Sequence, residues 1–266
     1  MSRRIEPFRD GRGEGLVLSR RGLLRAGALG AGGLALSGCD RLNDSPGFRT
    51  LLDSAEELHL RAQRLIGRDA LAREYTRAQM SPVFRANGNR EVTDSAYLRH
   101  VASGFAGWAL QVDGLVRRPL AMPLSALQAL PQRAQITRHD CVEGWSAIGE
   151  WQGPQLAHVL HLAGLLPQAR YIVFHCADRF GAAPYYESID LADAFHPQTI
   201  LAWRMNGQPL PVAHGAPLRL RVERQLGYKH AKYVMRIEAR ATLAGLYGGK
   251  GGYWEDSNGY QWYAGI

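Results

Sequence analysis

The sequence predicts an α+β fold, in which the strands of mixed β-sheets are joined by turns and short helices. Runs of alternating or wholly apolar residues, typical of strands, recur from residue 108 onward. Turn dipeptides join some of these runs into hairpins, and only short helical patterns separate the others, which argues against a doubly wound sheet. The predicted strands are Trp108–Val112, Leu115–Val116, Gln135–Thr137, Tyr171–Cys176, Thr199–Met205, Pro217–Val222 and Tyr233–Ala239.

Two turn dipeptides carry the hairpin predictions. Asp113-Gly114 lies between the first two predicted strands, and Asn206-Gly207 follows the strand that ends at Met205. Such pairs favour the tight turns whose twist matches that of antiparallel strands. The run that begins at Tyr171 is apolar as far as Phe174, which indicates a strand buried on both faces.

Four segments have helical spacing, and two of them carry a clear apolar face. In Pro154–Leu162 and just beyond it, the residues expected to be buried are Leu156, Val159, Leu160 and Ala163. An earlier helix, with Ser54 and Glu57 in capping-box spacing, has an apolar face made of Leu51, Ala55, Leu58, Ala62, Leu65 and Ile66. Shorter helices are predicted over Pro123–Leu130, starting near Ser125, and over Asp190–Phe195. Turn-rich residues 43–47, 80–90 and 243–266 are expected to be a tether and two loops.

The charge of the chain is unevenly distributed. The 266 residues are 46% hydrophobic and carry a formal net charge of +8. Half of that charge lies in residues 1–38, where seven arginines outnumber three acidic residues. No basic stripe is interleaved with aromatic residues in the way that tracks a nucleic-acid strand. We therefore expect no nucleic-acid partner.

Residues 1–38 have the pattern of an export signal. The run Ser19-Arg20-Arg21-Gly22-Leu23-Leu24-Arg25 precedes thirteen uncharged residues, Ala26–Gly38, which are too few to span a membrane. The arginine pair resembles the twin-arginine export motif. Because that route carries proteins already folded, it favours a periplasmic protein that receives a cofactor before export. The alternative is a basic tail followed by an Ala/Gly-rich helix.

Leu36-Ser37-Gly38-Cys39 resembles a bacterial lipobox, in which the cysteine is acylated and becomes the new N-terminus. Asp40 resembles the signal that retains such lipoproteins at the inner membrane. We therefore expect a lipid anchor at Cys39 on the outer face of the inner membrane; cleavage without lipid is the alternative. The predicted organisation is a signal segment at 1–38, a tether and amphipathic helix at 39–80, and a main domain at 81–266.

Two cysteines remain after such processing. Cys141 follows a predicted strand and begins an irregular, Trp-flanked segment, where functional groups often lie. Neighbouring His139 and Arg138 would favour its thiolate, which a metal could bind. A disulfide between Cys141 and Cys176, or two buried thiols, is equally compatible with the sequence. His158 and His161 could bind a metal but are more typical of a solvated helix face, and residues 248–252 fit a flexible surface loop better than a phosphate-binding loop.

Two motifs resemble the sulfite oxidase superfamily. Cys141-Val142-Glu143-Gly144-Trp145-Ser146, with Trp151-x-Gly153 behind it, is similar to the molybdenum-ligand segment of that family. His214-Gly215-Ala216-Pro217-Leu218-Arg219-Leu220 and Gly227-Tyr228-Lys229-His230-Ala231-Lys232 resemble its pterin-binding region. The resemblance extends over about residues 81–240. It is greatest to a bacterial branch that contains the catalytic subunit of the periplasmic protein-methionine-sulfoxide reductase.

The resemblance implies a sulfite-oxidase-type fold that binds Mo-molybdopterin, with Cys141 as the only protein ligand of the metal. It also implies that Arg219 and Lys232 hold the phosphate and pterin of the cofactor, a task that suits an arginine fork and a lysine charge. The remaining positions that it assigns to the cofactor site are Arg85, Asn87, Cys176, His214, His230 and Ala231. Cys176 stands where relatives have a threonine and is expected to border the pocket.

The chain also departs from the family. Sulfite oxidases have an arginine for their anionic substrate in the loop around Phe84–Asn87, where this chain has Ala86 beside Arg85. The Tyr-Glu pair of the methionine-sulfoxide branch is missing there too. Only 34 residues follow Lys232, so we expect neither a heme domain nor the C-terminal immunoglobulin-like domain of the sulfite oxidases.

The resemblance thus implies a molybdenum oxidoreductase that transfers an oxygen atom to or from a small-molecule substrate. The reaction would be S-oxide or N-oxide reduction or a sulfite-type oxidation. Electrons would be exchanged with a membrane cytochrome b or a soluble c-type cytochrome. Tyr253, Trp254, Tyr260 and Tyr263 could close the pocket. Two rival interpretations are a non-catalytic lipoprotein that keeps the fold as a binding module and a metal-free thiol or disulfide protein.

Overall fold

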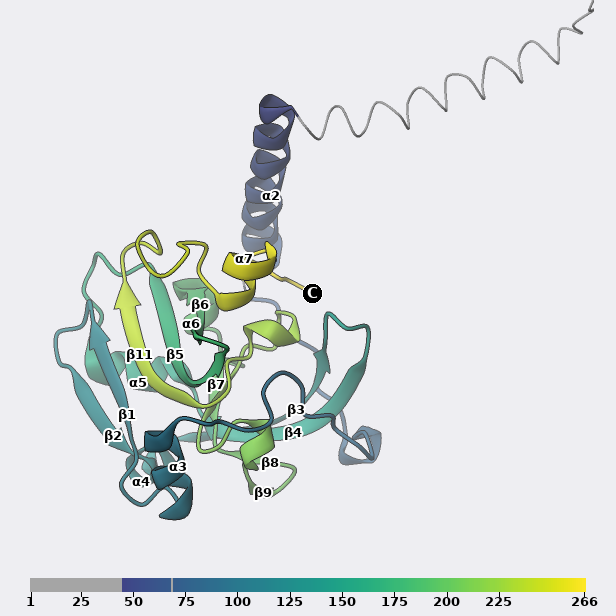
Figure 1. The fold of residues 1–266 in the computed structure, drawn as a ribbon. Coiled ribbons are helices and arrows are strands. Elements are labelled where there is room, and N and C mark those ends of the chain that lie inside the picture. The colour runs from purple at the N-terminus through teal and green to yellow at the C-terminus, as the bar shows by residue number, and fades with distance from the viewer. Residues whose placement is uncertain (1–44, 68) are drawn as a thin grey trace, which may run out of the picture. The chain divides into compact units, whose positions relative to one another are not determined.

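The computed structural model describes residues 45–67 and 69–266, which belong to two compact units, 1–66 and 67–266 (Figure 1). The predicted export signal and the predicted anchor at Cys39 lie outside the described residues. None of the described helices is both long and apolar enough to cross a membrane.

The described part of the first unit is the helix α2, Pro46–Gly67. It begins at Pro46, a residue well suited to a first helical position, so the expected tether over residues 43–47 is wrong in its second half. Ser54 is inside the helix and its Oγ donates to the carbonyl of Leu51, so it does not cap the helix. The predicted apolar face is exposed: Leu51, Leu58 and Leu65 are 62%, 64% and 86% accessible.

The second unit is built on a five-stranded mixed sheet in the order β2-β1-β11-β5-β6. Its β1 and β11 run parallel, and the other neighbours are antiparallel, as the α+β prediction requires. The predicted strand at Tyr171 continues past Cys176, with a register shift between His175 and Arg179. The bounds are β1 Ala109–Gly114, β2 Leu120–Pro123, β5 Tyr171–Phe180, β6 Ala183–Asp190 and β11 Val234–Arg240.

A second, four-stranded sheet has the order β3-β4-β8-β9, and β7 pairs with β10 in a separate ribbon. Figure 1 shows β3 and β4 as a long, curved hairpin on the side of the unit opposite β1 and β2. The segment after Cys141, expected to be irregular, forms β4; only the turn around Cys141 is irregular, closed by a 2.9 Å hydrogen bond from the Cys141 amide to the Trp145 carbonyl. The bounds are β3 Gln132–Asp140, β4 Ser146–Pro154, β7 Ile200–Ala202, β8 Arg204–Met205, β9 Gln208–Pro209 and β10 Arg219–Arg221.

The two predicted turns have different outcomes. Asn206 and Gly207 have φ values of 50° and 76° and connect β8 to β9, which is the mirror-image turn that this dipeptide favours. Asp113-Gly114 does not turn, because β1 runs through both residues and residues 115–119 connect it to β2. The predicted strand Thr199–Met205 is divided, since its first part pairs with β10 and its last part with β4.

The short helices lie close to their predicted positions. In α5, Leu156–Ala163, the four residues expected to be buried are all at most 1% exposed. Helix α6, Leu191–Ala194, begins where the Asp190 carboxylate accepts the amide hydrogen of Asp193. Two helices were not predicted, α3 and α7, and the second lies in the region expected to be a loop. The remaining bounds are α3 Ser95–Ala102, α4 Leu124–Ala129, α7 Tyr253–Asn258, η1 Arg77–Gln79, η2 Val212–His214 and η3 Gly227–Lys229.

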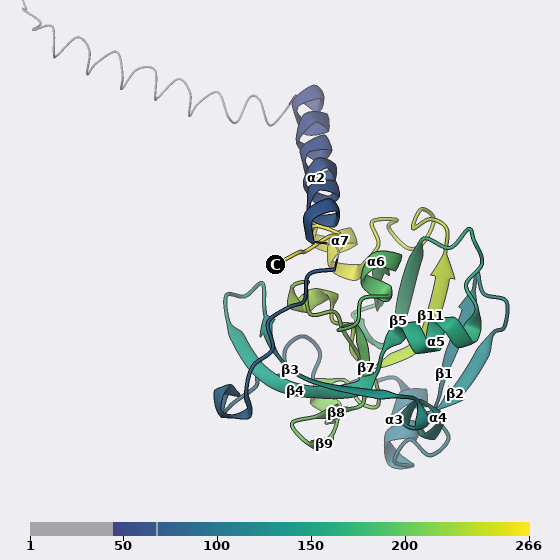
Figure 2. The ribbon, with the colours of Figure 1, turned by 180° about the vertical axis from the view of Figure 1, so that it is seen from behind.

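The main hydrophobic core lies between the five-stranded sheet and α5, which Figure 2 shows against β5 and β11. Sheet residues such as Leu110, Phe174 and Ile237 are fully buried there. Residues 67–80 join the same unit along the other sheet: the Tyr75 amide donates to the Ile136 carbonyl at 2.8 Å, and Glu74 bridges to Thr137. Residues 74 and 75 thus extend the edge of the second sheet at β3.

A substitution at Gly153 would test the close contact between β4 and β7. A Cβ atom at this position would overlap the carbonyl oxygen of Leu201, which is backbone and cannot move aside. We expect Gly153→Ala to lower the free energy of unfolding by about 3 kcal/mol, the upper range for overpacking. Gly107→Ala is the matched control, because nothing lies within 4 Å of its added Cβ. Equal midpoints of the two variants in urea unfolding would contradict this close approach of the two strands.

Candidate active site

One cavity of about 400 Å³ opens between the end of β3, the loop 81–91, the β5–β6 hairpin, the segments around η2 and η3, and the C-terminal segment. Seven of the nine residues predicted for a cofactor site line it. They are Arg85, Asn87, Cys141, His214, Arg219, His230 and Lys232. These residues come from distant parts of the chain, so the fold gathers them around one space.

Cys141 is the thiol of this cavity and is 8% exposed. The Asn87 side-chain amide donates to its Sγ at 2.9 Å. Burial raises the pKa of the Cys141 thiol, so the expectation that Arg138 and His139 would favour the thiolate is wrong. Arg138 is turned to Asp140, 2.9 Å away, and burial and Arg221 hold the pKa of His139 well below its ordinary value. The surroundings of Cys141 therefore favour the protonated thiol.

Lys232 ties the loop 81–91 to the pterin-like motif. Its Nζ donates to the carbonyl oxygens of Asn87 at 2.7 Å, of Ala213 at 3.1 Å, and of Asn89. Gly215 permits this arrangement, because it has a φ of 108° and an added Cβ would lie 2.8 Å from the Cβ of Lys232. Burial, together with the charge of Arg219, lowers the pKa of Lys232 to about 7.

Arg219 supplies a second buried positive charge. Its guanidinium lies 4.7 Å above the ring of Trp151 and donates to the carbonyls of His214 at 3.1 Å and His230 at 3.4 Å. Its Nε is buried and has no partner. Burial and the neighbouring Arg221 lower the pKa of Arg219 to about 9. Within the described part of the chain, neither Arg219 nor Lys232 forms an ion pair with a carboxylate.

Asp178 is a buried acidic group of the cavity wall and was not singled out from the sequence. The Asn89 amide donates to its Oδ2 at 2.9 Å, while its Oδ1 is buried without a partner. Burial raises the pKa of Asp178 to about 6. His214 also lines the cavity, and burial lowers its pKa to about 4, so its ring is uncharged at neutral pH.

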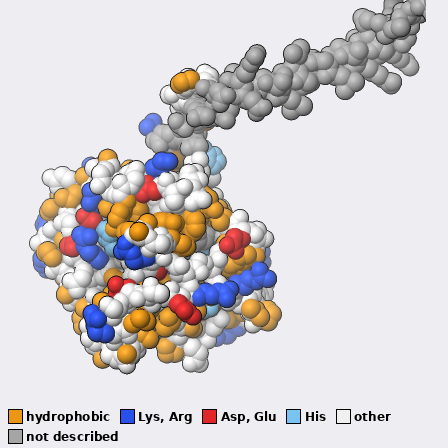
Figure 3. Space-filling view, viewed as in Figure 1, with side chains coloured by type: hydrophobic (Ala, Val, Ile, Leu, Met, Phe, Trp, Pro, Cys, Tyr) orange, Lys and Arg blue, Asp and Glu red, His pale blue; other side chains and the backbone are white. Residues whose placement is uncertain are grey.

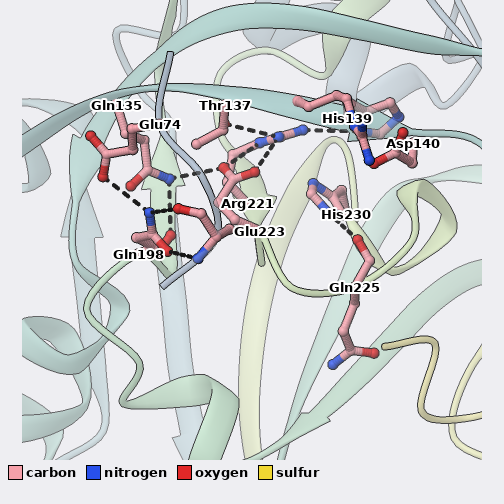
Figure 4. A network of polar contacts seen from close by, with 12 residues as sticks. Glu74, Gln135, Thr137, His139, Asp140, Gln198, Arg221, Glu223, Gln225 and His230 are labelled. Atoms are coloured by element: carbon pink, nitrogen blue, oxygen red, sulfur yellow. Dashed lines mark hydrogen bonds and ion pairs between the residues drawn. The ribbon is translucent and has the colours of Figure 1, made fainter. Parts of the chain in front are cut away.

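The sequence also did not predict that polar side chains on the inner face of β3 would be buried. Gln135, Thr137 and His139 alternate inward and are at most 5% exposed, and Cys141 continues the row. They contact the buried pair Arg221–Glu223, and Gln135 links Glu223 to Gln198 (Figure 4). Counting back from Cys141 in steps of two along the predicted strand would have identified His139, because alternate residues of a strand share a face.

The other predicted residues lie outside the cavity wall. Ala231 is fully buried in the main core. Cys176, on β5, is half-buried and packs against that core. Both described thiols are free, so the alternative of a disulfide between Cys141 and Cys176 is not found. In the described chain, no cluster of three histidine, cysteine or acidic residues could hold a metal ion, and His158 and His161 belong to none.

Aromatic side chains form the outer part of the wall. Trp254 and Tyr260 line the cavity, as does Tyr228, whereas Tyr253 instead stacks on Phe180 with ring centres 4.7 Å apart. Tyr263 does not line it. Figure 3 shows apolar side chains mixed with lysine and arginine side chains on the face of the compact unit seen there. The cavity wall thus combines positively charged side chains with aromatic ones.

Residues 99–245 match the oxidoreductase molybdopterin binding domain family, and the chain belongs to this family. Residues 99–245 thus form an oxidoreductase molybdopterin-binding domain, which confirms the family that the two motifs predicted.

Among curated proteins, the chain is 46% identical over 160 residues to the "Putative protein-methionine-sulfoxide reductase subunit YedZ1" of Azospira oryzae. The match covers 60% of this chain and 56% of that relative, so this chain spans little more than half of the relative's length. Among solved structures, the sulfane dehydrogenase SoxCD of Paracoccus pantotrophus matches with a TM-score of 0.48 and 23% identity, over 52% of this chain and 39% of that one.

The cavity fits a molybdopterin. A buried anion such as a phosphate requires positive side chains and N–H donors that are not already neutralised. Arg219 and Lys232 supply positive charge that no carboxylate of the described residues neutralises. The three N–H groups of Lys232 are used by backbone carbonyls, whereas Nε of Arg219 and Nδ1 of His230 have no partner and remain for a polar ring system. Cys141, the remaining requirement, lines the same cavity.

Asp178 should make the stability of the cofactor-free protein depend on pH. Its carboxyl keeps the proton up to about pH 6 in the folded chain but loses it near pH 4 when unfolded. The folded state therefore binds the extra proton, and this group should lower the free energy of unfolding as the pH rises from about 4 to about 6. Asp178→Asn should remove that fall and be more stable than wild type by about 2 kcal/mol at pH 7. Urea unfolding at pH 4 and pH 7 measures the difference; equal stabilities at pH 7 would contradict it.

Proposed function

We propose that this chain is the catalytic subunit of a periplasmic reductase that uses a molybdenum cofactor to reduce S-oxides, with methionine sulfoxide as the first substrate class to test. The observation that carries the proposal is that the Cys141 thiol lines the same cavity as Arg219 and Lys232, two cations without a carboxylate partner among the described residues. The name of the Azospira oryzae relative supports the choice of substrate.

In this proposal Cys141 would hold the metal, and Arg219 and Lys232 would hold the phosphate of the molybdopterin. When bound, the cofactor supplies two-electron oxygen-atom transfer. Asn87 donates to the sulfur and keeps it oriented toward the cavity. Lys232 keeps Asn87 in place by donating to its carbonyl oxygen. The residue proposed to hold the phosphate therefore also positions the residue that contacts the Cys141 sulfur.

Other residues would handle the substrate. Reduction of a sulfoxide to a sulfide and water consumes two electrons and two protons. Asp178 can hold a proton on the cavity wall up to about pH 6. The aromatic rings of Tyr228, Trp254 and Tyr260, which line the cavity, would contact the alkyl group of a sulfoxide. Arg85, which is adjacent to the position where sulfite oxidases have their substrate-binding arginine, also lines the cavity. The electrons would come from a cytochrome.

Cys141 provides the first test. Purified holoprotein should contain about one molybdenum per chain, and Cys141→Ser should lose more than about 90% of sulfoxide-dependent oxidation of a reduced electron carrier, since it removes the sole protein ligand. Cys176→Ser, which changes the other described thiol, is the matched control and should keep its molybdenum.

A screen of S-oxides, N-oxides and sulfite with the same holoprotein decides the substrate. Turnover of sulfite alone would replace S-oxide reduction by the sulfite-type oxidation. Molybdenum-loaded protein without turnover of any of the three classes would refute the proposed catalytic role.

The export signal and the lipid anchor are part of the proposal. Cys39→Ala should move the protein from the membrane to the soluble periplasmic fraction, because a single sulfur carries the proposed anchor. Replacing Arg20 and Arg21 by lysine should instead retain it in the cytoplasm. Immunoblots of cell fractions measure both, and unchanged fractionation of Cys39→Ala would contradict the anchor.

A further inference from the structure

His139 lies at the cavity end of the inner face of β3 and has no role in the site as described so far. Its ring is 5% exposed and is surrounded by other rings, with centre distances of 5.6 Å to Phe84, 5.7 Å to Trp145 and 5.0 Å to His230. It is two residues before Cys141 on the same strand face, and it lines the cavity. The ring is therefore held firmly beside the thiol.

The hydrogen bond to Arg221 fixes the tautomer of His139. The Nη1 atom of Arg221 lies 3.0 Å from Nδ1 of His139 (Figure 4). A guanidinium can only donate, so Nδ1 must be the bare acceptor and the hydrogen of the neutral ring must be on Nε2.

Arg221 cannot readily turn away from this contact. Glu223 binds its Nε at 2.9 Å and its Nη2 at 2.5 Å, and both side chains are completely buried. Breaking one partner of such a buried pair leaves an uncompensated charge, which is costly. The pair Arg221–Glu223 thus acts as a fixed support for the ring.

The Nε2–H of His139 has no hydrogen-bond partner among the described residues, and Gly227 keeps the space beside it open. A Cβ atom on Gly227 would lie 2.5 Å from Nε2. Gly227 and His139 both line the cavity. A side chain at position 227 would therefore occupy the space next to the Nε2–H of His139, and glycine leaves that space open.

The neighbouring His230 has the opposite polarity. Its Nε2 lies 3.0 Å from the carbonyl oxygen of Gln225 and must donate to it, which leaves Nδ1 as the bare acceptor. That Nδ1 is buried without a partner, in a residue 3% exposed. The two rings therefore offer one donor and one acceptor to whatever fills the cavity.

We propose that His139 is an additional cofactor-binding residue, which donates a hydrogen bond from Nε2 to the molybdopterin, and that Arg221 and Glu223 are positioning residues that set its tautomer. His230 would accept a hydrogen bond beside it through Nδ1. This inference rests on the cofactor of the family and not on the substrate of the proposed function.

Two amide substitutions separate this role from a structural one. In His139→Asn, the Oδ1 atom can accept from Arg221 in place of Nδ1, but no donor reaches the position of Nε2. In His139→Gln, the longer side chain places an N–H donor near that position. We expect His139→Asn to release molybdopterin from the holoenzyme about tenfold faster than wild type, the effect of one buried hydrogen bond. His139→Gln should stay within about twofold of wild type.

The measurement is the fluorescence of oxidised pterin released from holoenzyme over time, with urea unfolding of the cofactor-free variants alongside. His139→Asn releasing the cofactor at the wild-type rate would overturn the inference. Equally fast release by both variants would also overturn it, because a ring needed only for packing predicts that result. The assay uses no substrate, so a failure of sulfoxide reduction would leave its outcome unchanged and would be recognised separately.

Discussion

The positive charge buried around the cavity is the constraint on which the rest of the site depends. Arg219 is buried and Lys232 is partly buried, and neither forms an ion pair with a carboxylate among the described residues; burial lowers the pKa of both side chains. Backbone carbonyls and the face of Trp151 offset part of the cost. A dianionic phosphate would offset the rest, so a binding preference for an anionic cofactor is built into the fold itself.

Lys229, which lies on the same motif, differs from Lys232 because carboxylates neutralise its charge. Lys229 contacts Glu187 at 2.6 Å and Glu255 at 2.5 Å, with all three side chains almost fully buried. Burial alone would lower its pKa, but the two carboxylates raise it. Glu255 belongs to α7, so this cluster attaches the C-terminal segment, including cavity residue Trp254, to the sheet. Within four residues the chain carries one lysine neutralised by two carboxylates and one whose ammonium group contacts only backbone carbonyls among the described residues.

Strand β3 connects stability and function. Its outer residues are solvated, while its inner residues Thr137 and His139 contact Arg221 and lead directly to Cys141. The thiol is thus placed at the end of a strand whose inner face is held by a buried ion pair, which is a more rigid support than a loop alone would provide. Lys232 holds the loop with Asn87 against the same sulfur from the other side.

The sequence by itself determined the α+β class, the helix α5 with its buried face and the Asn206-Gly207 turn, because these depend on local periodicity and on backbone preferences of single residues. Its two motifs also indicated the family. Only the tertiary structure decided that β4 begins at Ser146, that β7 and β8 join different sheets, and that Asp178 and His139 face the cavity. Those features depend on contacts between segments far apart in the chain, and the unpaired state of Arg219 and Lys232 is likewise a property of the folded surroundings.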